Sequence, residues 1–154
     1  MPWITLGLRR QTLKADINEL SNEDIQLSRK VRSVHRNLSY EQSVFDTKKK
    51  SELRDVKADY LKIRNERPAI DSDEYEEWKV EYAAAQEDYQ SQKQDIEDYY
   101  DDLNEEIETE AQDEEDALQD QITRTETQRD AQSAELQSIT DQVKSEIEAS
   151  AIKF

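Results

Sequence analysis

The sequence contains almost none of the residues that interrupt helices. Its 154 residues include one glycine, Gly7, and two prolines, Pro2 and Pro68. Glycine and proline are the strongest local breakers of secondary structure, so residues 8–67 and 69–154 can each form one very long helix. The scarcity of glycine also excludes a glycine-rich phosphate-binding loop. The composition therefore predicts an all-α protein.

Cysteine is absent, and His35 is the only histidine. These absences exclude disulfides and thiolate chemistry and remove the usual ligands of a transition-metal site. The many carboxylates lack the glycine-containing loop of an EF-hand, and a thin two-helix rod offers no concave ligand pocket. We therefore predict a protein that is not an enzyme, with no catalytic, cofactor-binding or metal-binding residues.

No apolar run approaches the roughly 20 residues that cross a bilayer. The short apolar run at residues 3–8 is followed by Arg9 and Arg10, whereas a secretory signal carries its positive charges before its apolar region. We expect a protein made in the cytosol, with no signal peptide or transmembrane segment, and compatible with incorporation into a virion or another extracellular assembly.

Charge is abundant and unevenly distributed. Charged residues make up 38% of the chain and hydrophobic residues 34%, a balance that suits extended helices burying only a narrow stripe. Residues 1–67 hold 15 Lys and Arg against 10 Asp and Glu, whereas residues 68–154 hold 6 against 28. Such asymmetry indicates a partner of opposite charge, and the nearest candidate is the other half of the same chain.

Apolar residues recur at alternating spacings of three and four, which is the pattern of a coiled-coil seam. The heptad pattern is interrupted between Phe45 and Val56, and an interruption of this kind locally unwinds the supercoil. The predicted intramolecular seam consists of Leu13, Ile17, Leu20, Leu27, Val31, Val34, Leu38, Phe45, Val56, Tyr60, Tyr75, Trp78, Tyr82, Tyr89, Ile96, Tyr99 and Leu103.

The fold predicted from these patterns is a long antiparallel helical hairpin, a two-helix coiled coil that forms one structural unit. We expect an apolar N-terminal segment at residues 1–8, a basic helix at 9–66, a turn at 67–72 and an acidic helix at 73–152. A turn this short makes the two helices antiparallel neighbours. The poor helix formers at residues 101–105 leave open a break into three helices.

The predicted register places residue i opposite about 139 − i, so residues 130–154 overhang without an intramolecular partner. Exposed apolar stripes normally mark interaction sites, and the N-terminal segment lies at the same open end. The alternative is that residues 1–8 cover the overhang. The predicted interaction residues are Trp3, Ile4, Leu6, Leu136, Ile139, Val143, Ile147 and Phe154.

Three functions are compatible with this architecture. The first is a structural subunit of a large assembly, most specifically a phage or virion component, which joins copies or neighbouring subunits through its open end. The second is an adaptor, scaffold, chaperone or stalk protein, because in topology and length the chain resembles the helical-hairpin stalk proteins of type III export machines. The third is an acidic DNA mimic.

The expected partners are proteins, either further copies or other assembly subunits. Fifteen acids against Lys93 alone between residues 87 and 116 favour a basic surface on a partner, and the same acids disfavour nucleic acid. We expect no membrane partner.

Overall fold

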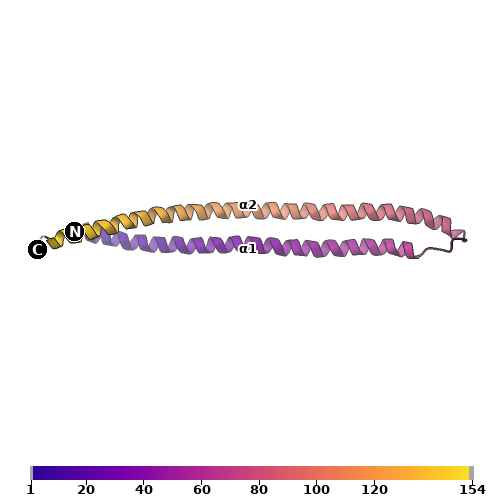
Figure 1. Ribbon diagram of the computed structural model, residues 1–154, viewed down its shortest axis with the longest axis horizontal. Coiled ribbons are helices and arrows are strands. Elements are labelled where there is room, and N and C mark those ends of the chain that lie inside the picture. Colours follow the sequence, from indigo (N-terminus) through magenta and orange to yellow (C-terminus); the bar gives the residue numbers. More distant parts are fainter. Residues whose placement is uncertain (1, 153–154) are drawn as a thin grey trace. The chain divides into compact units, whose positions relative to one another are not determined.

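The computed structural model describes residues 2–152 and contains two long helices, α1 (Pro2–Asn65) and α2 (Glu74–Ile152), packed against each other (Figure 1). The described residues contain no strand. The all-α helical hairpin is confirmed. The contacts within the chain group it into two compact units. We name residues 2–35 with 112–152 the terminal unit, and residues 36–111 the turn unit.

The helix ends at the turn follow from local sequence. Pro68 disfavours helical backbone in the residue before it, and α1 ends at Asn65. Lys62 and Arg64 occupy the last turn of α1, whereas three acids occupy the first turn of α2; both placements complement the helix dipoles. In the connection, the Ser72 hydroxyl and backbone N–H both donate to the carbonyl of Ala69, at 2.8 and 2.9 Å.

The N-terminal apolar segment is part of α1 and not a separate element. Proline is well tolerated at the first position of a helix, because its missing N–H would have no intrahelical partner there, and α1 begins at Pro2. The seam spacing of three and four also continues backward from Leu13 through Arg10 to Leu6. Leu6 packs against the buried cluster of Leu13, Ile139 and Val143, and this packing extends the helix to its beginning.

Helix α2 continues through residues 101–105 without a break. Tyr100, only 3% exposed, anchors this stretch, because its hydroxyl donates a 2.7 Å hydrogen bond to Glu52 of α1. Its ring also lies 6.3 Å from the ring of Phe45. These contacts with α1 outweigh the weak helix propensity of the following aspartates, as tertiary packing commonly does.

Tyr99 was wrongly predicted as a seam residue. Its side chain is 57% exposed, and the neighbouring Tyr100 is buried in its place. The alternation of three and four put the seam at Tyr99, three residues after Ile96, but the structure uses a spacing of four at this point. The half-buried residues Lys49 and Leu53 show the same spacing of four after Phe45 in α1.

The predicted overhang is wrong for residues 130–143. In the terminal unit, Arg9 pairs with Glu135 and Asp24 with Arg129. The residue numbers of these two pairs add up to 144 and 153, whereas paired residues in the predicted register add up to about 139. One reason lies in the connection, which covers residues 66–73 and carries the first turns of α2 beyond the end of α1 (Figure 1). Residues 130–143 consequently face the first turns of α1.

Burial along the seam is confined to a narrow line of side chains. The terminal unit buries most of them, and the turn unit contributes Tyr100. The buried hydrophobic residues are Leu13, Leu27, Val34, Tyr100, Leu118, Ile122, Ile139 and Val143. The other predicted seam residues, apart from Tyr99, are half-buried, as expected where only two helices share a stripe.

Candidate interaction surfaces

The predicted interaction residues at the open end of the terminal unit fall into a buried group and an exposed group. Ile139 and Val143 are each 7% exposed and form a core with Leu13, and Leu6 and Leu136 pack against that core. These four residues are therefore part of the hairpin and not a free surface, which corrects their assignment. Phe154 lies outside the described residues.

Other apolar side chains at this end remain exposed. Trp3, Ile4, Leu8 and Ile147 are 44%, 46%, 62% and 53% exposed, and we name them the open-end patch. Ile4 and Leu8 are four residues apart and share one helix face. Ile147 follows the buried Val143 by one helical turn, which brings it level with the first turn of α1. The patch leaves a hydrophobic surface at the end of an otherwise charged pair of helices.

Arg9 fastens the first turns of α1 onto α2. Its Nε and Nη2 donate to the two carboxylate oxygens of Glu135, at 3.0 and 3.2 Å, the bidentate geometry that arginine prefers. The hydrogen bond to Glu135 raises the pKa of the Arg9 guanidinium above its ordinary value. The side chains are about half exposed, so the pair fixes position more than it adds stability.

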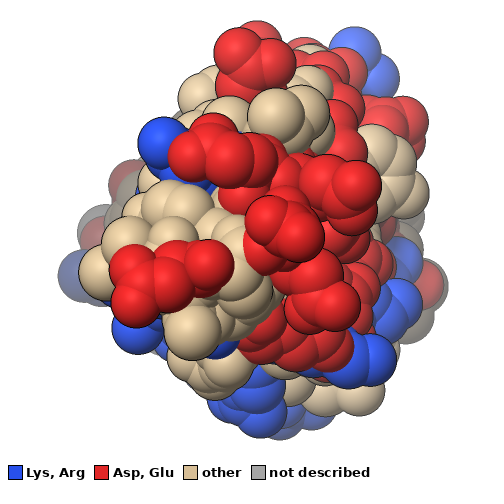
Figure 2. Space-filling model, turned by 90° about the vertical axis from the view of Figure 1, so that its right-hand side faces the viewer, with Lys and Arg blue, Asp and Glu red and all other residues tan. Residues whose placement is uncertain are grey.

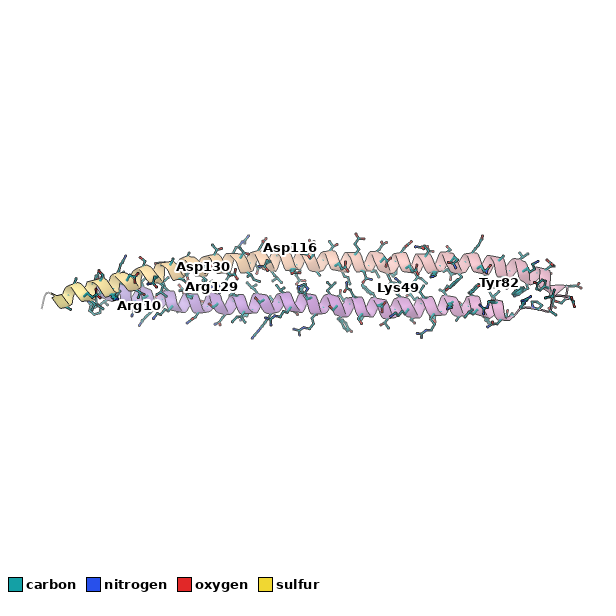
Figure 3. The ribbon with its side chains drawn as sticks, in the orientation of Figure 1. Arg10, Lys49, Tyr82, Asp116, Arg129 and Asp130 are labelled. Atoms are coloured by element: carbon teal, nitrogen blue, oxygen red, sulfur yellow. The ribbon has the colours of Figure 1, made fainter. Side chains whose placement is uncertain are left out.

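Polar layers interrupt the seam of the terminal unit. Arg129 lies between the helices and donates to Asp24 at 2.9 Å, whereas the exposed Asp116 lies on the outer side of α2 (Figure 3). The side chain of Asp24 is 13% exposed, and its Oδ1 has no hydrogen-bond partner among the described residues. Polar pairs at seam positions specify register at a cost in stability.

The turn unit carries a column of stacked aromatic rings. The ring of Trp78 lies 5.0 Å from that of Tyr82, and the ring of Tyr60 lies 4.9 Å from that of Tyr89. The indole Nε1 of Trp78 donates at 2.9 Å to the carbonyl of Ile63, near the end of α1 where carbonyls lose intrahelical partners. The column therefore closes the end of the hairpin.

The hydroxyls of Tyr60 and Tyr82 lie 2.8 Å apart and share a hydrogen bond. This bond lowers the pKa of Tyr60 and raises the pKa of Tyr82, because the remaining hydroxyl proton can stabilise the first phenolate. The shared hydrogen bond joins a side chain of α1 to one of α2.

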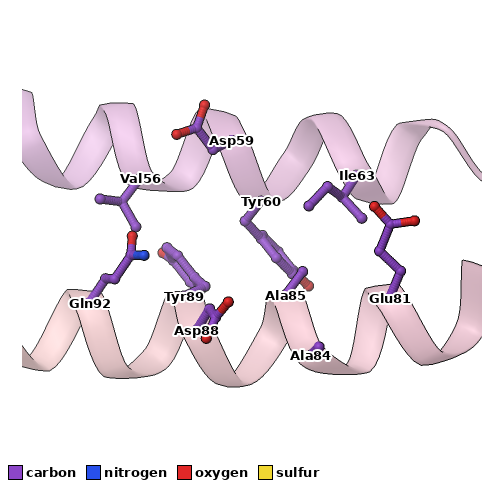
Figure 4. A pocket seen from close by; sticks show the side chains of 10 residues that line it. All are labelled: Val56, Asp59, Tyr60, Ile63, Glu81, Ala84, Ala85, Asp88, Tyr89 and Gln92. Carbon is purple, nitrogen blue, oxygen red and sulfur yellow. The ribbon is translucent and has the colours of Figure 1, made fainter.

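A groove of about 270 Å³ opens beside these rings, between α1 and α2 (Figure 4). We name it the aromatic groove. The rings of Tyr60 and Tyr89 lie between the helices, and Glu81 reaches toward α1 at one end. Its apolar lining consists of Val56, Tyr60, Ile63, Ala84, Ala85 and Tyr89, and its carboxylates come from Asp59, Glu81 and Asp88.

Sequence reasoning missed this groove. The tyrosines were assigned to the seam, which is consistent with their half-buried state, and heptad spacing does not show that a seam stays open on one side. The signal that could have revealed it is the run Ala83, Ala84 and Ala85. Small side chains on α2 beside the large rings of Tyr60 and Tyr89 leave space that no side chain of the turn unit fills.

The acidic residues of α2 are largely uncompensated in the turn unit. Residues 74–111 carry 15 Asp and Glu against Lys79 and Lys93. The ion pairs of these carboxylates within the unit are Lys49 with Asp101 at 3.6 Å and Lys79 with Glu76 at 3.8 Å. From the turn end, carboxylates form a broad band along one side, with Lys and Arg below it (Figure 2). The band attracts basic groups.

Neither a metal site nor a membrane span emerges from residues 2–152. In this range no three His, Cys, Asp or Glu side chains converge to hold a metal ion. Neither helix of the described chain has a stretch long and apolar enough to cross a membrane. Comparison with family models, curated proteins and solved structures gave no match for this chain.

Proposed function

We propose that this chain is a non-enzymatic structural subunit that joins copies of itself into an assembly through the open-end patch. The observation that carries the proposal is the exposure of Trp3, Ile4, Leu8 and Ile147 together at one end of the terminal unit. Other exposed apolar residues, such as Ile25, stand alone among polar neighbours, and single exposed residues are normal.

The accessible area supports a role in assembly. The chain exposes 11608 Å², whereas a compact monomer of 18.1 kDa exposes roughly 8,000 Å² by the usual scaling of area with mass. Two packed helices leave most of each helix surface available to neighbours. The most specific form of the proposal is a phage or virion component.

A double variant tests the open-end patch. In Ile4→Glu/Leu8→Glu, two exposed apolar side chains become charged, and a glutamate in the first turn of α1 favours the helix. We expect wild type to sediment as several chains and the double variant as a single chain. The control Ile25→Glu introduces one such charge at a residue that is 51% exposed elsewhere on α1, and it should sediment like wild type.

Circular dichroism establishes that all three proteins are helical. Identical sedimentation of wild type and the double variant would contradict the proposal, as would a wild type that is a single chain at every concentration.

A second candidate, the acidic DNA mimic, is favoured by the band of carboxylates on α2. In the turn unit α2 carries a net charge of −13 (2 bases and 15 acids), and residues 36–65 of α1 carry +3 (8 bases and 5 acids), so the neighbouring helix neutralises little of it. If the mimic is correct, the chain should displace DNA from a basic DNA-binding protein at low salt. Failure to displace DNA there would exclude this function.

A further inference from the structure

We propose that the aromatic groove of one copy receives the first turns of α1, residues 3–10, from a second copy. This inference rests on the proposed function and names the surface to which the open-end patch binds. Figure 4 shows the receiving surface, which lies in the turn unit and is built from residues 56–63 of α1 and 81–92 of α2.

The size and lining of the groove suit the burial of a few apolar side chains. Its volume of about 270 Å³ lies below the roughly 300 to 1,000 Å³ typical of ligand pockets. Val56, Ile63 and Ala84 supply an apolar surface beside the two tyrosine rings. Ile4 and Leu8, both exposed and one helical turn apart, can bury their side chains against such a surface together.

The charges of the two surfaces are complementary. Asp59, Glu81 and Asp88 line the groove, and none of them forms an ion pair with a described residue. The segment that would bind carries Arg10 beside Arg9, which is already paired with Glu135. It is followed by Lys14 and has no acid before Asp16. The first turn of α1 also lacks an acidic residue, so the positive pole of its helix dipole is uncompensated.

The occupant must come from another copy because the segment is already fixed within its own terminal unit. Leu6 packs on the core of Leu13, Ile139 and Val143, and Arg9 is bound to Glu135. These contacts hold the segment in place and leave Ile4 and Leu8 facing outward. The segment is thus presented as a preformed helix, which lowers the entropy cost of binding.

An interface between two different surfaces of the same chain is heterologous. Each copy offers one segment and one groove, so binding continues from copy to copy and produces a ring if the geometry closes, or a filament if it does not. This is the expected behaviour of a subunit in a repeating assembly.

Two groove variants test the proposal. Ala84→Trp places a large side chain in the groove, whereas Ala83→Trp adds the same side chain to an exposed neighbour that does not line it. We expect Ala84→Trp to be a single chain by light scattering and Ala83→Trp to keep the mass of wild type. Circular dichroism verifies that both variants remain helical.

Mixing completes the experiment. Ala84→Trp retains an intact segment, and Ile4→Glu/Leu8→Glu retains an intact groove, so an equimolar mixture can form one heterologous contact. We expect each variant alone to be a single chain and the mixture to reach twice the single-chain mass.

The outcomes separate this inference from the proposed function. If Ala84→Trp assembles like wild type while Ile4→Glu/Leu8→Glu does not, the open end joins copies elsewhere, and only the groove assignment is overturned. A mixture that stays at the single-chain mass also overturns the groove assignment. If neither variant changes the mass of an assembling wild type, both proposals fail.

Discussion

Each buried side chain contributes a large share of the stability of this hairpin, because few side chains are buried. Leu13 is the one large side chain among the described residues with no exposed surface, and it packs on Ile139 and Val143 in the terminal unit. In a core of three buried side chains, few neighbouring atoms can move to fill the cavity that a smaller side chain would leave.

Leu13→Ala should therefore destabilise the protein by about 2 to 4 kcal/mol, because it removes buried methyl groups and leaves a cavity. Ile25→Ala is the control, since Ile25 is 51% exposed and lies outside the open-end patch, and surface changes usually stay within about 0.5 kcal/mol. Urea unfolding of the two variants measures the difference. Equal effects would show that the first turns of α1 do not pack as described.

Tyr100 provides a residue-scale prediction about pH. Its hydrogen bond to Glu52 raises the pKa of its phenol to about 12, above the ordinary value of about 10. The folded state therefore keeps this proton in a range where the unfolded state loses it. The stabilisation from the bond is complete below about pH 10 and falls as the pH rises toward 12.

Thermal unfolding of wild type and Tyr100→Phe at pH 8, 10 and 11 tests this prediction. The phenylalanine variant keeps the ring packing but cannot donate to Glu52, so it should be less stable at pH 8. The stability difference should narrow above pH 10. A difference that stays constant through pH 11 would contradict the assigned bond.

The sequence allowed seam residues to be predicted well where the heptad was regular and poorly where it was interrupted. Leu13, Leu27 and Val34 are buried as expected. Tyr99 and Tyr100 are adjacent residues of the same type, so propensity and hydrophobicity cannot choose between them. The choice depends on the Glu52 carboxylate and the Phe45 ring across the hairpin, which local spacing does not reveal.

At the scale of the elements, the two helices followed from the scarcity of glycine and proline, whereas their register did not. Helix propensity places an end near Pro68, and α1 ends at Asn65. Register, in contrast, depends on how far the connection extends past α1 and on the polar pairs along the seam. The sequence does not show which acid pairs with which base across the seam, because acids and bases occur at many positions.

The Asp24 and Arg129 pair is expected to help set that register in the terminal unit. Arg129→Met leaves a nearly buried carboxylate unpaired and should cost about 1 to 3 kcal/mol, less than a fully buried pair because Arg129 is partly exposed. The double variant Asp24→Leu/Arg129→Leu should regain that stability or exceed wild type. Urea unfolding measures both effects, and a double variant less stable than Arg129→Met would contradict this role.

At the scale of the whole molecule, charge and exposed apolar area are the two properties that favour assembly. The chain carries a net charge of −17, most of it on α2. In residues 2–15, by contrast, every charged side chain is basic. The open-end patch adds hydrophobic area beside those positive charges. Trp3, Ile4 and Ile147 were predicted at this end from the sequence, whereas the exposure of Leu8 and the packing of Leu6, Leu136, Ile139 and Val143 into the hairpin depended on the register.

Molar mass in solution, measured by light scattering coupled to size exclusion at low and high salt, tests the central claim most directly. We predict a mass of several 18.1 kDa chains at low salt and a smaller mass at about 1 M salt, where screening acts over roughly 3 Å and weakens the contact of basic segments with acidic grooves. A mass of one chain at both salt concentrations would contradict self-assembly.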